Sequence, residues 1–399
     1  MKLRPLFILL AVLTLSATVR SAPGTLIPRP QEATRLDGQF VFTTGIPVVY
    51  ASGLEPLAEY IADYIPLQRL DDRTWTAGAA LRLSLDGTMD DESYRLTVTP
   101  QGVQVVGADY GGVFNGLQTL LQLLPPEVYT GQATLPLTVD ACRIEDAPRF
   151  HYRGMMLDVV RTWMDADRVK RHIDLLSHLK INKLHLLLSN DEGWRLEIKS
   201  HPELTEIGAW RGGDSPVMPV YGKWDEKYGG FYTQDEMRDL IRYAAVRNVE
   251  IIPELDLPGH SRNFARVHPE ILCDYTPDLR PTAGYDYRSV WCASREENYR
   301  LLADILGELA ALFPSEYLHI GGDEADRTAW KSCPRCRHLA RELGGVDQVQ
   351  CYLVEHAEKF LAEHGRTMIG WDEILKNNLR STSTVISYRG QRGGIEAAN

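Results

Sequence analysis

The sequence predicts an α/β protein: a (β/α)8 barrel of the TIM type, incomplete at about six strands, preceded by a small α+β domain. Three observations lead to this prediction. From Phe150 onward, short apolar runs alternate with amphipathic stretches of helical length, which is typical of parallel sheets built from βα units. Polar residues follow the ends of these runs, where barrel enzymes place their functional side chains. Residues 23–148 instead mix hairpin and helix patterns, as layered α+β domains do.

Length and composition fit a globular protein of more than one domain. The chain has 399 residues, with 44% hydrophobic and 24% charged residues, which is ordinary for such proteins. The net charge of −11 argues against binding to nucleic acid, because that requires a basic surface. The same charge disfavours anionic membrane surfaces.

Residues 1–22 are interpreted as a secretory signal peptide. Lys2 and Arg4 precede an apolar run, Pro5–Ala17, that is too short to span a bilayer. Cleavage is expected after Ala17 or Ala22. We therefore expect an exported protein, periplasmic or extracellular, with no membrane span in the mature chain.

Residues 23–148 form the predicted α+β domain, to which we assign a supporting role because catalytic residue types do not cluster there. Its expected junction with the barrel is the segment Ala147-Pro148-Arg149. Apolar periodicity predicts strands and helices in this domain. The strands are Ala80–Leu85, Glu92–Thr99 and Val103–Gly107, and the helices are Gly111–Leu124 and Leu54–Leu70.

Residues 149–399 form the predicted catalytic barrel. Its expected strands are Met155–Val160, Lys183–Ser189, Val249–Asp256, Tyr317–Gly322, Thr367–Trp371 and Thr384–Tyr388. Its expected helices are Asp167–Leu179, Gln234–Arg247, Arg295–Phe313 and Gln348–His364. A complete barrel has eight strands, so we expect the sequence to be truncated at its C-terminus or the barrel to be unusual. Long insertions, Gly193–Thr233 and Pro258–Ser294, follow the second and third strands.

Polar residues collect after each predicted strand, and a barrel would bring them all to one rim. In strand order they are Asp158 and Arg161; Asn190, Asp191 and Trp194; Asp256 and His260; Asp323 and Glu324; Trp371, Asp372 and Glu373; and Tyr388 and Arg389. An acidic pair after a strand also fits the first turn of a helix, whose dipole favours carboxylates. Six groups in register favour a functional site.

Asp323 and Glu324 suggest glycoside hydrolysis, which usually employs two carboxyl groups on either side of the scissile bond. Neighbouring residues of an extended chain point apart, so this pair does not fit an acid and a nucleophile facing each other. One of them fits a general acid, with the substrate's own 2-acetamido group as nucleophile.

We expect no metal and no cofactor. His185 and His319 lie inside predicted strands, where core or supporting histidines are commoner than ligands. The segment Cys333-Pro-Arg-Cys336 has the spacing of half a zinc site, but no second pair lies at zinc-ribbon spacing. A local disulfide or free thiols are favoured, and whether Cys273 and Cys292 pair is left open.

Several segments together resemble glycoside hydrolase family 20, the β-N-acetylhexosaminidases. The resemblance extends from the first domain to the last residue, and its motifs are highly specific. They are Gly116–Leu123, Tyr152–Val159, Asp191-Glu192-Gly193-Trp194-Arg195, Leu204–Trp210, Pro258-Gly259-His260 and Gly321-Gly322-Asp323-Glu324.

The resemblance implies a role for each matching residue. Glu324 resembles the general acid/base, and Asp323 the residue that orients the 2-acetamido group and stabilises the oxazolinium intermediate. Asp256 and His260 resemble the pair that couples to the acid. The residues expected to bind substrate are Arg161, on the 3- and 4-hydroxyls, Trp371, as a wall of the acetamido pocket, Asp191 and Tyr388.

The chain departs from the family pattern at several positions. Asn190 replaces the first acid of an Asp-Asp-Gln motif, Thr162 replaces a histidine, and Tyr388 replaces a tryptophan. The family's Tyr-x-Asp element after the seventh strand and its tryptophan after the eighth have no counterpart.

The resemblance implies an exo-acting β-N-acetylhexosaminidase that releases terminal β-linked GlcNAc or GalNAc from glycans or chitooligosaccharides, with retention and substrate assistance. Two alternatives stay open. The absent strands and Asn190 fit an inactive or carbohydrate-binding homologue, and a different loop shape would give a disaccharide-releasing, lacto-N-biosidase-like enzyme.

Overall fold

The computed structural model describes residues 25–213, 226–274, 289–376 and 383–399, so the expected signal peptide lies outside the described residues. The chain divides into two compact units, Met1–Arg149 and Phe150–Asn399. Within the described ranges, no helix combines the length and apolar character needed to cross a membrane.

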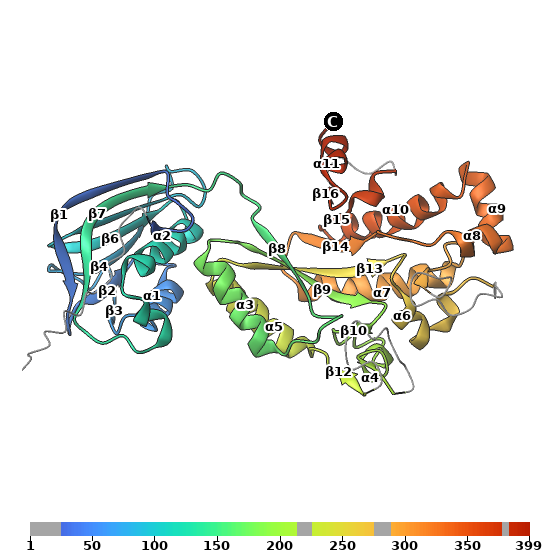
Figure 1. Cartoon of the computed structure of the whole chain (residues 1–399), viewed down its shortest axis with the longest axis horizontal. Coiled ribbons are helices and arrows are strands. Elements are labelled where there is room, and N and C mark those ends of the chain that lie inside the picture. Colours follow the sequence, from blue (N-terminus) through green and yellow to red (C-terminus); the bar gives the residue numbers. More distant parts are fainter. Residues whose placement is uncertain (1–24, 214–225, 275–288, 377–382) are drawn as a thin grey trace, which may run out of the picture. The chain divides into compact units, whose positions relative to one another are not determined.

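The first unit is a seven-stranded sheet in the order β1-β7-β5-β6-β4-β2-β3, with helices α1 and α2 against one face (Figure 1). The side chain of Asp109 accepts a hydrogen bond from the backbone N–H of Gly112 and so caps α2. The bounds are β1 Glu32–Phe42, β2 Pro47–Tyr50, α1 Glu55–Ala62, β3 Gln68–Asp71, β4 Leu81–Leu85, β5 Tyr94–Thr99, β6 Gly102–Gly107, α2 Tyr110–Leu123 and β7 Leu137–Asp146.

The α+β character of this unit is confirmed, but one predicted helix is too long and several strands were not predicted. β5 and β6 form the predicted antiparallel pair. The helix predicted over Leu54–Leu70 is wrong in its second half, because α1 ends at Ala62 and the chain then forms β3. Pro66 has no backbone N–H and disfavours the helical conformation of Ile65, so the helix cannot continue. β1, β2 and β7 were not predicted.

The second unit contains six parallel strands in the order β8-β9-β13-β14-β15-β16, with β8 and β16 at the two ends (Figure 1). The order in space follows the order in sequence, as in a (β/α)8 barrel. The prediction of an incomplete barrel is therefore confirmed. The short strand β10 pairs antiparallel with the end of β9, and β11 pairs antiparallel with β12.

The predicted strands and the four long predicted helices agree with the structure to within two residues at nearly every end. The strands are β8 Gly154–Asp158, β9 Lys183–Asn190, β10 Gly193–Trp194, β11 Trp210–Arg211, β12 Tyr228–Gly229, β13 Glu250–Leu257, β14 Tyr317–Gly321, β15 Thr367–Trp371 and β16 Thr384–Ile386. The helices are α3 Ala166–His178, α4 Glu203–Glu206, α5 Gln234–Val246, α6 Arg262–Val267, α7 Glu296–Leu312, α8 Thr328–Ser332, α9 Pro334–Leu343, α10 Asp347–Glu363 and α11 Gln391–Ala398.

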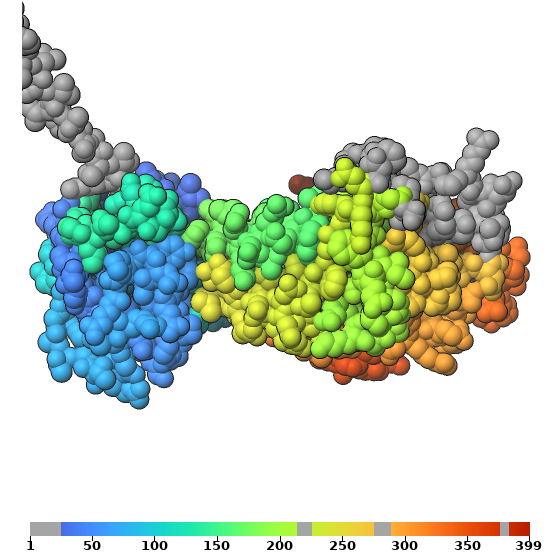
Figure 2. All heavy atoms as spheres, turned by 90° about the horizontal axis from the view of Figure 1, so that it is seen from below, coloured from blue at the N-terminus to red at the C-terminus, as the bar shows by residue number. Residues whose placement is uncertain are grey.

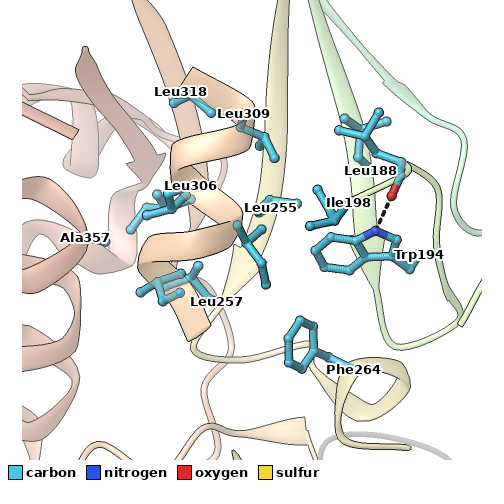
Figure 3. Close-up of a cluster of buried hydrophobic side chains, with 14 of the residues drawn as sticks. Leu188, Trp194, Ile198, Leu255, Leu257, Phe264, Leu306, Leu309, Leu318 and Ala357 are labelled. Carbon is cyan, nitrogen blue, oxygen red and sulfur yellow. Dashed lines mark hydrogen bonds between the residues drawn. The ribbon is translucent and has the colours of Figure 1, made fainter. Parts of the chain in front are cut away.

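The core of the second unit lies between its sheet and the surrounding helices. β9 and β13 are buried along nearly their whole length, as expected for parallel strands covered on both faces. Figure 3 shows Leu306 and Leu309 of α7 beside Leu255 of β13 and Leu318 of β14. Full burial of a leucine side chain contributes about 1.5–3 kcal/mol, so this packing helps to hold α7 against the sheet.

The helices α3 and α5 lie side by side, as the green and yellow segments of Figures 1 and 2 show. Asp174 of α3 joins them, because its carboxylate accepts hydrogen bonds from the Tyr243 hydroxyl at 2.8 Å and from Nε of Arg247 at 2.6 Å. Thr233 and Glu236 form a capping box that starts α5.

Candidate active site

A cavity of about 170 Å³ opens at the carboxyl ends of the six parallel strands. Every strand contributes to its lining, either with its last residues or with the loop that follows. In strand order these residues are Arg161, Asn190, Asp256, Asp323, Trp371 and Tyr388. Parallel strands place their carboxyl ends on one rim, which explains why residues so distant in sequence meet here.

His260 joins the acidic residues beside this cavity. Its Nδ1 lies 3.0 Å from Oδ2 of Asp191, and its Nε2 lies 3.4 Å from Oδ2 of Asp323 and 3.4 Å from Oε2 of Glu324. The imidazole is buried, whereas 39% of the Glu324 side chain is exposed. Glu324 is therefore open to a ligand on one side and held by His260 on the other.

Two aspartates, Asp191 and Asp256, lie beside His260. Asp191 contacts Nδ1 and also accepts the backbone N–H of Arg262 at 2.9 Å. Asp256 has a carboxylate oxygen within 4.8 Å of a ring nitrogen of His260, and it also accepts a hydrogen bond from Nδ2 of Asn190 at 3.2 Å. The expected pair of Asp256 and His260 therefore stays a prediction, to which the structure adds Asp191, in the loop after β9, as the carboxylate that contacts Nδ1.

The charges around His260 favour its imidazolium form. Burial alone would lower its pKa, but hydrogen bonds to Asp191 and Asp323 and the nearby charge of Asp256 raise the pKa of His260 to about 12. Burial, followed by the charge of Asp323, raises the pKa of Asp256 well above its usual value. The cluster therefore places one cation among several carboxyl groups.

The raised pKa predicts how His260 stabilises the fold at different pH values. The unfolded imidazole has a pKa of about 6.5. The contribution of the raised pKa to the free energy of unfolding is therefore full below pH 6.5 and is lost as pH rises toward 12. We expect the difference in unfolding free energy between wild type and His260→Gln to shrink between pH 6.5 and 9, by up to about 1.4 kcal/mol per pH unit. Denaturant unfolding at several pH values measures it.

The matched control for this experiment is His338→Gln, on the exposed face of α9. A difference for His260→Gln that stays constant from pH 6 to pH 9 would show that folding does not raise the pKa of the imidazole.

Arg161 is fixed by three polar neighbours at the cavity. Its Nη1 lies 2.7 Å from Oδ2 of Asp158, its Nη2 donates to Oδ1 of Asn190 at 3.1 Å, and its Nε lies 3.7 Å from Oε2 of Glu192. Asn190 therefore bridges Arg161 and Asp256, because its amide offers both an acceptor and a donor. Asn190 stands where the family pattern has an acid, and it still makes a polar link between Arg161 and Asp256.

Trp371 is oriented by a buried carboxylate that the sequence analysis did not identify. Its indole Nε1 donates to Oε1 of Glu254 at 2.9 Å. His185 Nε2 lies 2.7 Å from Oε2 of Glu254, and His319 Nδ1 lies 3.1 Å from Oε1. Both histidines therefore contact the carboxylate that accepts the indole N–H. An acidic residue within an apolar strand was the signal that could have identified Glu254.

Tyr388 and Glu324 are linked through Glu373, a second residue to which no role was assigned. Oε1 of Glu373 accepts the Tyr388 hydroxyl at 2.8 Å and the backbone N–H of Glu324 at 3.3 Å. The rings of Trp371 and Tyr388 meet edge to face with centroids 5.5 Å apart. The two aromatic residues therefore form one wall of the cavity, tied to the loop that contains Glu324.

Gly321 allows the backbone of β14 to turn beside Asp256. Its φ is +70°, and a Cβ at this position would lie 2.0 Å from Oδ1 of Asp256. Glu324 also has a positive φ, +48°, which is uncommon for a residue with a side chain. The turn thus stores backbone strain next to the carboxylates.

We expect Gly321→Ala to destabilise the fold by more than about 2 kcal/mol, because positive φ and a steric clash act together. Gly344→Ala is the control, since Gly344 has φ of +89° with open space around its Cβ position. That change is expected to cost about 1 kcal/mol. Denaturant unfolding measures both, and equal losses would show that Asp256 moves aside without cost.

The comparisons with known families cover both units. The catalytic domain of Glycosyl hydrolase family 20 matches residues 150–399, and domain 2 of the same family matches residues 24–147. A beta-hexosaminidase of Porphyromonas gingivalis is 38% identical over 387 residues, which are 94% of this chain and 48% of that protein. A beta-hexosaminidase of Vibrio furnissii is 38% identical over 95% of this chain and 62% of its own length.

Solved structures agree with this assignment. The GH20 exo beta-N-acetylglucosaminidase of Vibrio harveyi, in complex with N-acetylglucosamine, superimposes with a TM-score of 0.86 at 33% identity, over 95% of this chain and 60% of that one. The N-acetyl-beta-hexosaminidase of Streptomyces plicatus gives 0.79 at 31% identity, over 95% and 72%. The chain spans about half to two thirds of the length of the curated relatives named above. On these matches, the chain belongs to glycosyl hydrolase family 20.

Proposed function

We propose that this chain contributes the catalytic acid and the substrate-orienting aspartate of an exo-acting β-N-acetylhexosaminidase. The observation that supports it most directly is a buried acceptor at the cavity. Among the described residues, Oδ1 of Asp323 is buried without a hydrogen-bond partner, while its Oδ2 lies beside His260. Buried acceptors are normally satisfied, and the N–H of a sugar's 2-acetamido group would satisfy this one.

In the proposed reaction the acetamido carbonyl oxygen attacks the anomeric carbon and forms an oxazolinium ion. The bond to the leaving oxygen breaks, and Glu324 gives its proton to that oxygen. The negative charge of Asp323 stabilises the positive ring. Glu324 then takes a proton from water, whose oxygen attacks the anomeric carbon and reopens the ring. Two displacements at one carbon retain its configuration.

The rest of the cavity fits the sugar in this proposal. The guanidinium of Arg161, held by Asp158 and Asn190, presents donors suited to the 3- and 4-hydroxyls. Trp371 and Tyr388 supply an aromatic wall for the apolar face of the ring and the acetamido methyl group. The proposed substrates are terminal β-linked GlcNAc or GalNAc residues of glycans or chitooligosaccharides.

The test is hydrolysis of 4-nitrophenyl N-acetyl-β-D-glucosaminide by the chain, with the matching glucoside as control. Nitrophenolate release from the first substrate alone, inhibited by a thiazoline mimic of the cyclic intermediate, is expected. Binding of the thiazoline without turnover would favour a carbohydrate-binding homologue and overturn the enzymatic proposal. Absence of both binding and turnover would overturn the proposed site as well.

We further propose that the protein is exported, on the basis of the signal-like composition of residues 1–22. N-terminal sequencing of protein recovered outside the cytoplasm, from cells that express the whole chain, is expected to start near residue 18 or 23. Recovery of the intact N-terminus in the cytoplasm alone would contradict export.

A further inference from the structure

Four cysteines from separate parts of the sequence converge in the core of the second unit. They are Cys273, Cys292, Cys333 and Cys336, and their sulfur atoms all lie within 4.8 Å of one another. All four are buried free thiols. The first two lie within the insertion after β13, and the last two lie in the segment after β14. Two loops therefore contribute two thiols each.

The sulfur spacing distinguishes the arrangements that four cysteines can adopt. Sγ of Cys336 lies 3.7 Å from Sγ of Cys273 and 3.5 Å from Sγ of Cys292. A disulfide requires about 2.05 Å between sulfurs. A tetrahedral zinc site with Zn–S bonds of about 2.3 Å places its sulfurs about 3.8 Å apart. These two separations are close to the edge of such a tetrahedron, and the other sulfur pairs lie within 4.8 Å.

The chemistry around the thiols also fits a metal. Cys333 and Cys336 have the C-x2-C spacing of structural zinc sites. The hydroxyl of Ser294 lies 3.3 Å from Sγ of Cys292 and 3.4 Å from Sγ of Cys336, where it can donate to a thiolate. Cysteines that only fill a core behave as small apolar residues, which gives no reason for four of them to meet.

The loops that supply the thiols also contain the proposed catalytic residues. One runs from β13 through His260 to Cys292, and the other from β14 through Glu324 to Cys336. The indole Nε1 of Trp330 donates to the backbone oxygen of Trp291 at 2.9 Å, so the two loops already touch beside the cluster. Bonds between the four cysteines and a shared ligand would hold the two loops together and so help to fix the distance between His260 and Glu324.

We propose that Cys273, Cys292, Cys333 and Cys336 bind one Zn²⁺ as a closed, four-coordinate structural site that ties these two loops together. Soft thiolate ligands in a tetrahedral set select zinc among the common divalent metals. With all four positions occupied by protein, the metal takes no part in hydrolysis. The proposal does not rest on the proposed activity, because a structural site is equally expected in an inactive homologue.

The test uses the whole chain, purified without chelator and assayed for metal by mass spectrometry. About one zinc per chain is expected, released by a mercurial that titrates thiols. Cys336→Ser and Cys333→Ser are expected to lose most of the zinc, whereas the matched control Cys142→Ser, a buried cysteine in the first unit, keeps it. Zinc that stays in both cluster variants would overturn the assignment of the ligands.

A second measurement keeps the proposal testable if the variants do not fold. Wild-type protein prepared with Co²⁺ in place of Zn²⁺ is expected to show the intense visible and charge-transfer bands of a tetrahedral tetrathiolate. Metal-free protein with disulfides among these cysteines would overturn the proposal. Metal-free protein whose four thiols are all reactive after unfolding in inert atmosphere would overturn it equally.

Discussion

Replacing Glu324 by glutamine is expected to lower kcat on substrates with poor leaving groups by about 10²–10⁴, the usual contribution of a general acid. Glutamine keeps the shape of the side chain and its contact with His260, but it has no proton to give to the leaving oxygen. The side chain is the partly exposed member of the cluster and lies 3.4 Å from Nε2 of His260. It is therefore the carboxyl group most open to a leaving group.

The measurement compares two leaving groups on the same N-acetylglucosaminide. A chitooligosaccharide needs protonation of its leaving oxygen, whereas a dinitrophenolate leaves unassisted, so the loss in Glu324→Gln is expected to be far smaller with the activated substrate. The control is Glu363→Gln, which removes an equal charge from the exposed end of α10. Equal losses on both substrates, or near wild-type turnover on both, would show that Glu324 is not the acid.

Replacing Asp323 by asparagine is expected to lower kcat/KM by about 10²–10³, the range for removing one group that stabilises transition-state charge. The substitution removes the negative charge beside the developing oxazolinium ion. In the wild type, Oδ1 of Asp323 is buried and lacks a partner among the described residues. The asparagine carries no charge at this position with which to accept the acetamido N–H. Both effects act on ring formation and not on departure of the leaving group.

The two variants are therefore expected to respond differently to the leaving group. An activated dinitrophenyl substrate should rescue Glu324→Gln but not Asp323→Asn, because the acetamido attack still limits the second variant. Added azide tests the same point, since an external nucleophile can replace water but not the internal amide. If the activated substrate restored the turnover of Asp323→Asn as fully as that of Glu324→Gln, Asp323 would be shown to act on the leaving group.

The elements of the barrel could be predicted because each leaves a local pattern. β9 and β13 are apolar runs with polar residues at the ends, and α5 starts with a capping box. The prediction failed where the pattern was mixed. The apolar periodicity of Leu54–Leu70 continues past Pro66, although the helix does not, and β1 is mostly exposed and has no continuous apolar face. Local pattern therefore predicts an element where the pattern is continuous and fails where it is mixed.

The sequence predicted which residues line the cavity, but not all of the contacts among them. A parallel sheet brings every strand end to one rim, so the order of the sequence was enough to assemble Arg161, Asp323 and Trp371 around one cavity. The partner of His260 was not predictable in this way, because Asp191 and Asp256 both end neighbouring strands. The direction of the imidazole, with Nδ1 facing Asp191, shows which of the two makes that hydrogen bond.

The sequence by itself determined the family, the six strands and the identity of the carboxylates at their ends, because short motifs and apolar periods are local properties of a chain. The tertiary structure alone decided which distant side chains touch. It brought Cys273 and Cys292 to Cys333 and Cys336, and it placed Glu254 under Trp371. These contacts depend on the positions of loops and helices around neighbouring strands, and no spacing within the sequence records them.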